Sequence, residues 1–237
     1  MTASTPIVLV HGAWHGAWCF AGLQHALDQL GLPSYAIDLP GHGVSTEPLG
    51  TLQSDAAAVA EVLRALGTPA VLVGHSYGGA VITEAATLHP DVAHLVYLTA
   101  FALDAGESIM SLLTSLPRAE VALGAAIRPN PDGTSTIDPT MAANAFYAQC
   151  PTSTVQAALP RLGLHPMGTF TDSVTGSPRD HTASTYVRCT LDQAIHLSHQ
   201  DVMAARCTYV HTIETDHSPF ASATDLTAGI LKGVVGS

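Results

Sequence analysis

Ser76 has the sequence surroundings of a nucleophilic serine. It is the central residue of GHSYG (residues 74–78), a G-x-S-x-G pattern. The apolar run Ala70–Val73 before it predicts a buried strand, and Gly79–Leu88 after it predicts a helix. On a sharp turn from strand to helix the serine oxygen is pushed outward, and small glycines leave room where the two elements crowd together. The context therefore indicates a serine nucleophile.

A candidate base for Ser76 lies near the end of the sequence. A serine hydroxyl is a weak nucleophile until a base takes its proton, and the base must itself be oriented by an acid. His217 lies in a loop between a strand predicted at Thr208–His211 and a helix predicted at Ala223–Val234. We therefore expect His217 to be the base.

The acid has three candidates. Asp192 follows a strand predicted at Thr185–Arg188. It also fits the order serine, acid, histidine that is found along the chain in enzymes with a nucleophilic serine on this kind of turn. Asp104 also follows a predicted strand and is an alternative in a rearranged site. Asp216 is the direct neighbour of the histidine, but a sequence neighbour points poorly at its partner's ring. Chain order favours Asp192.

Acyl transfer also requires two backbone donors for the oxyanion that forms in the transition state. One is expected to be the N–H of Tyr77, the residue after the nucleophile. The second is expected after the first strand, where Gly12 allows the backbone to turn its amides inward. We predict the N–H of Ala13 as this donor; the alternative is that this segment is only a turn that ends a strand.

The sequence gives little sign of a metal or cofactor site. His196 and His199 have a helical spacing that could hold a metal, but no third ligand is evident. The cysteines show no metal or redox spacing. We therefore expect neither a metal nor a cofactor, and we interpret the cysteines as reduced thiols of a cytoplasmic protein. They are Cys19, Cys150, Cys189 and Cys207.

Strand and helix signals alternate at both ends of the chain, which predicts an α/β fold with a mainly parallel central sheet and helices on both faces. Further strands are predicted at Ile7–Val10, Tyr35–Ile37 and His94–Leu98, and further helices at Trp18–Leu30 and Leu52–Leu66.

The alternation breaks between about residues 104 and 183. This stretch is rich in proline, glycine, serine and threonine, and it is too long for an ordinary connection. We predict a helical cap inserted into a single domain that spans residues 1–237, with helices at Met110–Leu123, Pro139–Ala148 and Thr152–Leu162. Aromatic and histidine side chains that could line the substrate pocket are Trp14, His15, Phe101, Phe146, Tyr147 and Phe170, although any of them could equally be core.

Composition narrows the function classes. The 237 residues are 47% hydrophobic and 11% charged, as in a globule with a large core. Nineteen acidic against eight basic residues give a formal charge of −11, which repels phosphate backbones and anionic lipid, so we expect neither a nucleic-acid nor a membrane partner. Met1–Pro6 does not resemble a signal peptide. The oligomeric state stays open, a homodimer included.

Four segments together resemble one branch of the α/β-hydrolase fold, that of plant methylesterases and hydroxynitrile lyases, with similar bacterial esterases. They are VLVHGAWHGAW (8–18), LVGHSYGG (72–79), YVRCTLDQAI (186–195) and IETDHSPF (213–220). The cap shares only FYAQCP (146–151). The resemblance implies a triad of Ser76, Asp192 and His217 with Ala13 and Tyr77 as the oxyanion pair. The turn DLPGHG (38–43) differs from the plant members, so their substrates do not transfer.

The combined expectation is a cofactor-independent serine hydrolase of a small, largely apolar ester or lactone. One alternative is a lyase that uses the same triad as a base. In the lyases that resemble this chain, a lysine follows the catalytic histidine and a threonine replaces the glycine after the first-strand histidine; here Ser218 and Gly12 occupy those places. The other alternative is a catalytically idle protein that binds a small ligand, for which three intact triad groups would be unnecessary.

Overall fold

A parallel sheet forms the centre of the molecule. The computed structural model describes residues 5–236. Its strands, in chain order, are β1 (Ile7–Val10), β2 (Ser34–Ile37), β3 (Ala70–Ser76), β4 (Val92–Ala100), β8 (Ser184–Cys189) and β9 (Tyr209–Ile213). They lie in the order β2-β1-β3-β4-β8-β9, and every neighbouring pair is parallel. The predicted strands and the mainly parallel sheet are confirmed.

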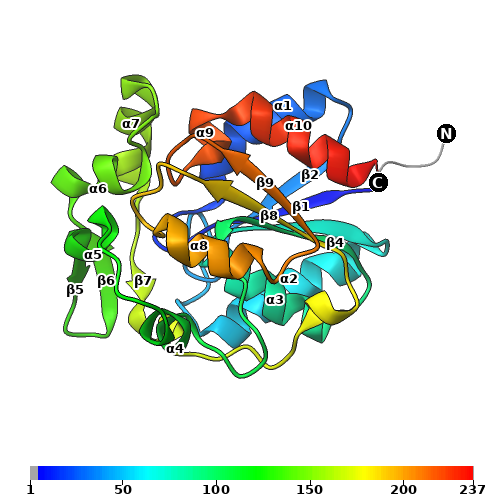
Figure 1. The fold of residues 1–237 in the computed structure, drawn as a ribbon, viewed down its shortest axis with the longest axis horizontal. Helices are drawn as coiled ribbons and strands as arrows, with labels where there is room; N and C mark the ends of the chain where they lie inside the picture. Colours follow the sequence, from blue (N-terminus) through cyan, green and yellow to red (C-terminus); the bar gives the residue numbers. More distant parts are fainter. Residues whose placement is uncertain (1–4, 237) are drawn as a thin grey trace.

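Helices cover both faces of this sheet (Figure 1). On one face lie α1 (Ala21–Gln29), preceded by a 3₁₀ turn at Ala17–Phe20, and α10 (Thr224–Val235). On the other lie α2 (Leu52–Leu66) and α3 (Gly78–Leu88). The remaining helices outside the cap are α8 (Leu197–Ala204), which the sequence did not predict, and the short α9 (Pro219–Ser222).

The side chains of a strand point alternately to the two faces of the sheet, and this explains why apolar residues pack under the helices on both faces. Ile7 and Leu9 of β1 are fully buried in the core under α1 and α10, whereas Val8 and Val10 are fully buried in the core under α2 and α3. Successive side chains of a strand point to opposite faces, so a strand covered on both faces has a continuous apolar sequence. This arrangement leaves the carboxyl ends of the strands, where the predicted site residues follow, at one edge of the sheet.

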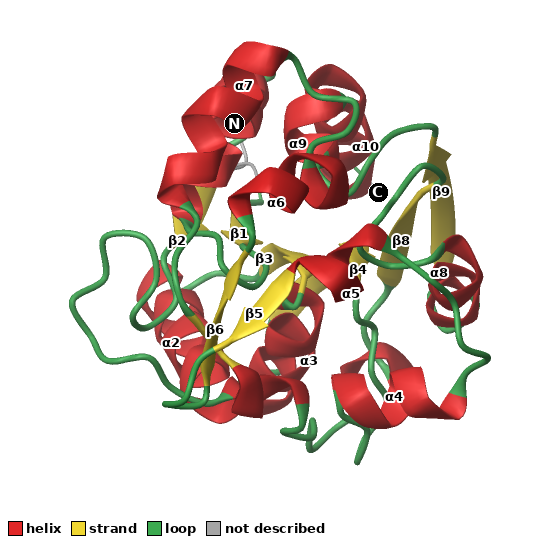
Figure 2. Cartoon of the chain, turned by 90° about the vertical axis from the view of Figure 1, so that its left-hand side faces the viewer, coloured by secondary structure: helices red, strands yellow, loops and turns green. Residues whose placement is uncertain are grey.

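We call residues 104 to 183 the cap. Its middle part, residues 122 to 166, lies at this edge (left in Figure 1, facing the viewer in Figure 2), whereas its last residues run back past α3 to Ser184, where β8 begins. The cap forms a small antiparallel sheet in the order β5-β6-β7 together with short helices. The elements are α4 (Ile109–Ser115), α5 (Ala122–Ala126), β5 (Ile127–Pro129), β6 (Thr134–Ile137), α6 (Pro139–Phe146), α7 (Thr152–Ala158), β7 (His165–Pro166) and 3₁₀ turns at Leu159–Arg161, Met167–Phe170 and Pro178–Asp180.

The structure of the cap differs from the prediction in two respects. The single helix predicted at Met110–Leu123 is two helices, because α4 ends at Ser115 and α5 begins at Ala122. Pro117 between them lacks an amide hydrogen and disfavours a helical residue before it. The small sheet was not predicted. No helix among residues 5–236 is long and apolar enough to cross a bilayer.

Candidate active site

Ser76 lies at a tight junction between β3 and α3. Its φ of +53° is in the left-handed region, which a non-glycine residue seldom adopts. A Cβ added to Gly78 would lie 2.5 Å from the carbonyl oxygen of Val10, so only glycine fits where the helix begins against β1. Strain and close packing of this kind are features of a nucleophile elbow.

Asp192 and His217 form a buried pair. Nδ1–H of His217 donates a hydrogen bond to Oδ2 of Asp192 at 2.7 Å, and both side chains are almost completely shielded from solvent. Since Nδ1 is used in this way, Nε2 is the nitrogen left to exchange a proton. The fold thus brings together two residues that lie 25 positions apart in the sequence.

The carboxylate of Asp192 accepts further hydrogen bonds from several parts of the chain. Oδ1 accepts from the backbone amides of Ala194 and Ile195, at 2.6 and 2.9 Å. Oδ2 accepts from the hydroxyl of Thr99 at 2.5 Å and from Nε2 of Gln200 at 3.3 Å. These donors fix the direction of the carboxylate toward His217 and satisfy its oxygens in a buried place. Thr99 and Gln200 were not predicted, and no sequence pattern connects them to Asp192.

His75 packs against the ring of His217 and forms a hydrogen bond with its backbone. Its Nε2–H donates to the backbone carbonyl of His217 at 2.7 Å, and the two rings lie 4.6 Å apart. Burial, followed by the charge that His217 can carry, lowers the pKa of His75 well below its usual range. His75 is therefore a neutral hydrogen-bond donor that fixes the backbone of the loop bearing His217.

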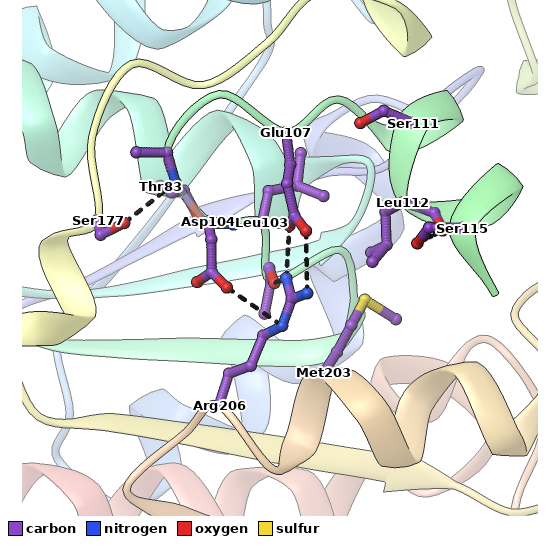
Figure 3. Close-up of polar contacts among 12 residues, drawn as sticks. Thr83, Leu103, Asp104, Glu107, Ser111, Leu112, Ser115, Ser177, Met203 and Arg206 are labelled. Carbon is purple, nitrogen blue, oxygen red and sulfur yellow. Dashed lines mark hydrogen bonds and ion pairs between the residues drawn. The ribbon is translucent and has the colours of Figure 1, made fainter.

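Asp104, the first rival acid, is occupied elsewhere. It accepts a hydrogen bond from Arg179 at 2.5 Å and lies 3.4 Å from Nε of Arg206, which also pairs with Glu107 (Figure 3). Its side chain is half exposed. Asp104 is thus an ion-pair partner of two arginines at the start of the cap, and within residues 5–236 it forms no hydrogen bond or ion pair with His217.

Asp216, the second rival, joins the histidine loop to the cap. Its Oδ2 accepts from the backbone amide of Gln149 in the cap at 2.6 Å. Its Oδ1 accepts from the amide of Ser218 at 3.0 Å and from the hydroxyl of Ser222 at 2.7 Å. A carboxylate committed to these donors orients the loop around His217, and it leaves Asp192 as the partner of the ring.

The loop after β1 lies directly against Ser76. A Cβ added to Gly12 would lie 2.9 Å from Cβ of Ser76 and 3.0 Å from Nδ1 of His75. Any larger residue at position 12 would therefore have to displace the elbow. Gly12 permits the backbone that carries Ala13 to approach Ser76 closely.

The peptide between Gly12 and Ala13 has a fixed direction. Nδ1–H of His11 donates to the carbonyl oxygen of Gly12 at 2.8 Å, while Nε2 accepts from the amide of Leu39 at 3.1 Å. Burial, and next the charge of His42, lower the pKa of His11 to about 3, so the ring is neutral. In a planar trans peptide the C=O and N–H point in opposite directions. The N–H of Ala13 is consequently turned away from His11.

Tyr77, which carries the other predicted donor, is anchored by its side chain. Its hydroxyl donates to Oδ2 of Asp55 on α2 at 2.6 Å, and both residues are buried. Burial raises the pKa of Asp55 to about 7. No local pattern predicts this contact, because Asp55 lies on α2 and Tyr77 in the turn before α3.

Most of the expected pocket side chains gather near His217 and the loop after β1. The ring of Phe146 lies 5.9 Å from that of His217 and 5.1 Å from that of His15. The hydroxyl of Tyr147 donates to Nε2 of His15 at 2.7 Å, and Phe170 packs 5.9 Å from Trp14. These contacts place aromatic side chains of the cap beside the ring of His217 and beside Trp14.

The two histidines with helical spacing serve the fold. His196 caps α8 by accepting from the amide of Ser198, and His199 donates to the carbonyl of Pro117 at 2.8 Å. Across residues 5–236, no group of three or more His, Cys, Asp or Glu side chains is arranged to hold a metal ion. The four cysteines are all free.

Two related proteins match this chain in sequence, one along nearly its whole length and the other along less than half of it. The chain is 28% identical over 253 residues to pFDCC methylesterase of Arabidopsis thaliana, covering 96% of this chain and 93% of the relative. It is 39% identical over 111 residues to a carbendazim hydrolyzing esterase of Nocardioides sp. (strain SG-4G). That match covers 45% of this chain and 46% of the esterase, so less than half of that relative's length is compared.

Solved structures show the same fold. A pyrethroid hydrolase from Sphingobium faniae JZ-2 superimposes with a TM-score of 0.86 at 23% identity, over 98% of both chains. A methylesterase from Arabidopsis superimposes with a TM-score of 0.82 at 25% identity, over 98% of this chain and 99% of the other. The expected resemblance to methylesterases is confirmed.

The family model of alpha/beta hydrolases matches residues 7–230, nearly the whole described chain. With the parallel sheet, the elbow at Ser76 and the methylesterase relatives, this match identifies the chain as a member of the alpha/beta hydrolase family.

Proposed function

We propose that this protein is a cytoplasmic serine hydrolase that cleaves small, largely apolar carboxylic esters or lactones. The observation that carries the proposal is the buried hydrogen bond between His217 and Asp192 at the edge of the sheet where the elbow presents Ser76. The esterase and methylesterase names of its relatives support the reaction class. The free cysteines support a reducing compartment.

In the first half of the reaction, Ser76 attacks the ester carbonyl. Nε2 of His217 takes the hydroxyl proton as the Oγ–C bond forms, and Asp192 stabilises the resulting imidazolium. The carbonyl oxygen becomes an oxyanion that the amides of Ala13 and Tyr77 bind. The C–O bond to the alcohol then breaks, His217 returns the proton to the leaving oxygen, and an acyl-enzyme remains on Ser76.

In the second half, water replaces the alcohol. His217 takes a proton from the water as it attacks the acyl carbonyl, and the same two amides bind the second oxyanion. The bond to Oγ breaks, the proton returns to Ser76, and the carboxylic acid leaves.

The apolar surroundings of the site favour an uncharged, compact substrate. Phe146, Trp14 and Phe170 contribute aromatic surface, whereas burial of a charged group near them would cost free energy without a partner. We propose that the cap shapes this pocket, as loops placed over a rigid scaffold commonly do.

Gly12 argues against the lyase alternative. A side chain at this position would collide with Ser76, so the threonine that resembling lyases carry there has no room. The residue after His217 is Ser218, which is neutral and cannot supply the positive charge that a leaving cyanide requires.

The experiment is a turnover assay of the purified protein with p-nitrophenyl acetate, a series of methyl and aryl esters and lactones, and mandelonitrile. We expect hydrolysis of small esters above background and no release of cyanide beyond the uncatalysed rate. Cyanide release that depends on Ser76, without ester turnover, would replace the hydrolase by a lyase. Binding without turnover of any substrate would favour the ligand-binding alternative.

A further inference from the structure

Trp14 has an unusual backbone conformation. Residues Gly12 to His15 form a turn closed by a hydrogen bond of 3.3 Å from the amide of His15 to the carbonyl of Gly12. Trp14 is the third residue of this turn and has a φ of +62°. Turns with a left-handed third residue normally have glycine or asparagine there, because a bulky side chain is strained in that conformation. Such a residue keeps this conformation only where its surroundings impose it.

Strain of this kind is confined to the site. Among residues 5–236, the non-glycine residues with positive φ are Trp14, Ser76 and Thr99. Ser76 is the proposed nucleophile, and Thr99 donates to Asp192. Trp14 adjoins Ala13, whose amide is the proposed oxyanion donor. The third strained residue therefore lies next to the proposed oxyanion donor, whose peptide also has the hydrogen bond from His11 to the carbonyl of Gly12.

The cap supplies the groups that impose the conformation of Trp14. Its indole Nε1–H donates to the hydroxyl of Ser135 in β6 at 3.1 Å, and its carbonyl accepts from the amide of Gly163 at 2.8 Å. The ring packs 5.6 Å from His165 and 5.9 Å from Phe170. Trp14 is 2% exposed, so its side chain is almost fully buried where it makes these contacts with the cap.

Ser135 is a well-defined partner for this indole. It is fully buried, and its own hydroxyl donates to the carbonyl of His165 at 3.2 Å, which leaves its lone pairs for Trp14. The hydroxyl thus connects β6, β7 and the loop after β1. Ser135 belongs neither to the triad nor to the oxyanion segments.

We propose that Trp14 is a positioning residue through which the cap fixes the oxyanion hole. The bonds to Ser135 and Gly163 maintain the left-handed turn. The bond that closes this turn, from the amide of His15 to the carbonyl of Gly12, then acts together with the bond from His11 to set the direction of the Ala13 amide relative to Ser76. This inference rests on the proposed function, because it assigns a role within the same reaction.

The test uses Ser135→Ala, which removes the acceptor but no group of the site. We expect kcat to fall about tenfold for every ester that the wild type cleaves, a fraction of the loss caused by deleting an oxyanion donor. KM should stay nearly unchanged. Affinity for an alkyl trifluoromethyl ketone, which forms an anionic tetrahedral adduct with the serine, should fall in the same proportion as kcat. Ser135→Thr retains the hydroxyl and should restore both.

Two controls separate this role from general damage to the cap. Ser173→Ala makes the same change at an exposed position of the cap and should leave kcat and ketone affinity unchanged. Trp14→Phe retains a packed ring and loses the N–H, so it should reproduce the effect of Ser135→Ala even if the latter proves unstable.

The outcomes distinguish the inference from the proposed function. If wild-type hydrolysis persists in Ser76→Ala, the proposed function is wrong. If hydrolysis depends on Ser76 but Ser135→Ala and Trp14→Phe change only KM or the order of preferred esters, the cap shapes the pocket without positioning the oxyanion hole, and the inference is overturned.

Discussion

The hydroxyl of Thr99 donates a hydrogen bond of 2.5 Å to Oδ2 of Asp192, the same oxygen that accepts from His217. Thr99 reaches this oxygen because it is an extra residue in β4: His75 pairs with Leu98 and Ser76 with Ala100. A bulge of this kind redirects a side chain, here from the sheet toward the acid. Its φ of +39° is the local strain that accompanies this placement.

Replacing Thr99 by valine preserves the shape and removes the hydroxyl. A hydrogen bond to a charged group contributes about 1.5–3 kcal/mol, so kcat should fall about tenfold or more if the bond orients Asp192 in the transition state. Steady-state kinetics of Thr99→Val and of Thr185→Val, a buried threonine at the start of β8, measure this. Equal, small effects in both variants would show that Thr99 has no part in catalysis.

The activities of variants at Asp192 and Asp104 show which of the two aspartates is the acid. Asp192→Asn should reduce kcat/KM by about 10⁴-fold, because an amide favours the wrong tautomer of His217. Asp104→Asn weakens ion pairs with Arg179 and Arg206 and should change activity little. The comparison of kcat/KM for the two variants checks this, and a reversed ranking would move the acid to the end of β4.

The parts of the fold that repeat a local pattern could be predicted from the sequence. Strands β1 and β3 are short apolar runs followed by glycine-containing turns, and α2 has an apolar stripe that begins after the N-cap Thr51. Ser76 ends β3, Asp192 follows β8 and His217 follows β9. Their order along the chain therefore led to the pair that the structure brings within hydrogen-bond distance.

The supporting contacts could not be predicted because they join distant parts of the chain. Thr99 and Asp192 are 93 residues apart, and Trp14 and Ser135 are 121 apart. Nothing local distinguishes these residues from others of their type. The small sheet of the cap was missed for a different reason: β7 has two residues and β5 ends in proline, so neither shows an alternating pattern.

Phe146 should influence which esters are cleaved. Its ring lies 5.1 Å from that of His15 and 5.9 Å from that of His217, the proposed base. Phe146→Ala should shift the relative kcat/KM across an ester series toward larger acyl groups, by about tenfold for the burial of one or two methylene groups. Parallel assays on acetate to octanoate esters measure the shift. An unchanged order of substrates in Phe146→Ala, and likewise in Tyr147→Ala and Phe170→Ala, would show that the cap does not shape the pocket.

Asp55 should make stability depend on pH. Burial raises its pKa from an ordinary value of 3.8 to about 7, so between these values the folded protein retains a proton that the unfolded chain has lost. Stability from this group is complete below about pH 4 and is lost as the pH rises to about 7, by at most about 1.4 kcal/mol per pH unit.

Asp55→Asn removes this titration and keeps an oxygen that accepts from Tyr77. Free energies of unfolding from urea titrations at pH 4.5, 5.5, 6.5 and 7.5 should therefore fall more steeply for the wild type than for the variant. Parallel pH profiles of the two proteins would mean that Asp55 titrates in the folded protein as it does in the unfolded chain.

The most direct test of the account is the turnover of p-nitrophenyl acetate by Ser76→Ala. Alanine fits the elbow and removes only the oxygen that forms the acyl-enzyme, so the variant should fold as the wild type does. We expect its kcat to be lower by about 10⁴-fold or more, with no burst of p-nitrophenol. A folded Ser76→Ala protein that retains more than a few per cent of the wild-type kcat would contradict the assignment of Ser76 as the nucleophile.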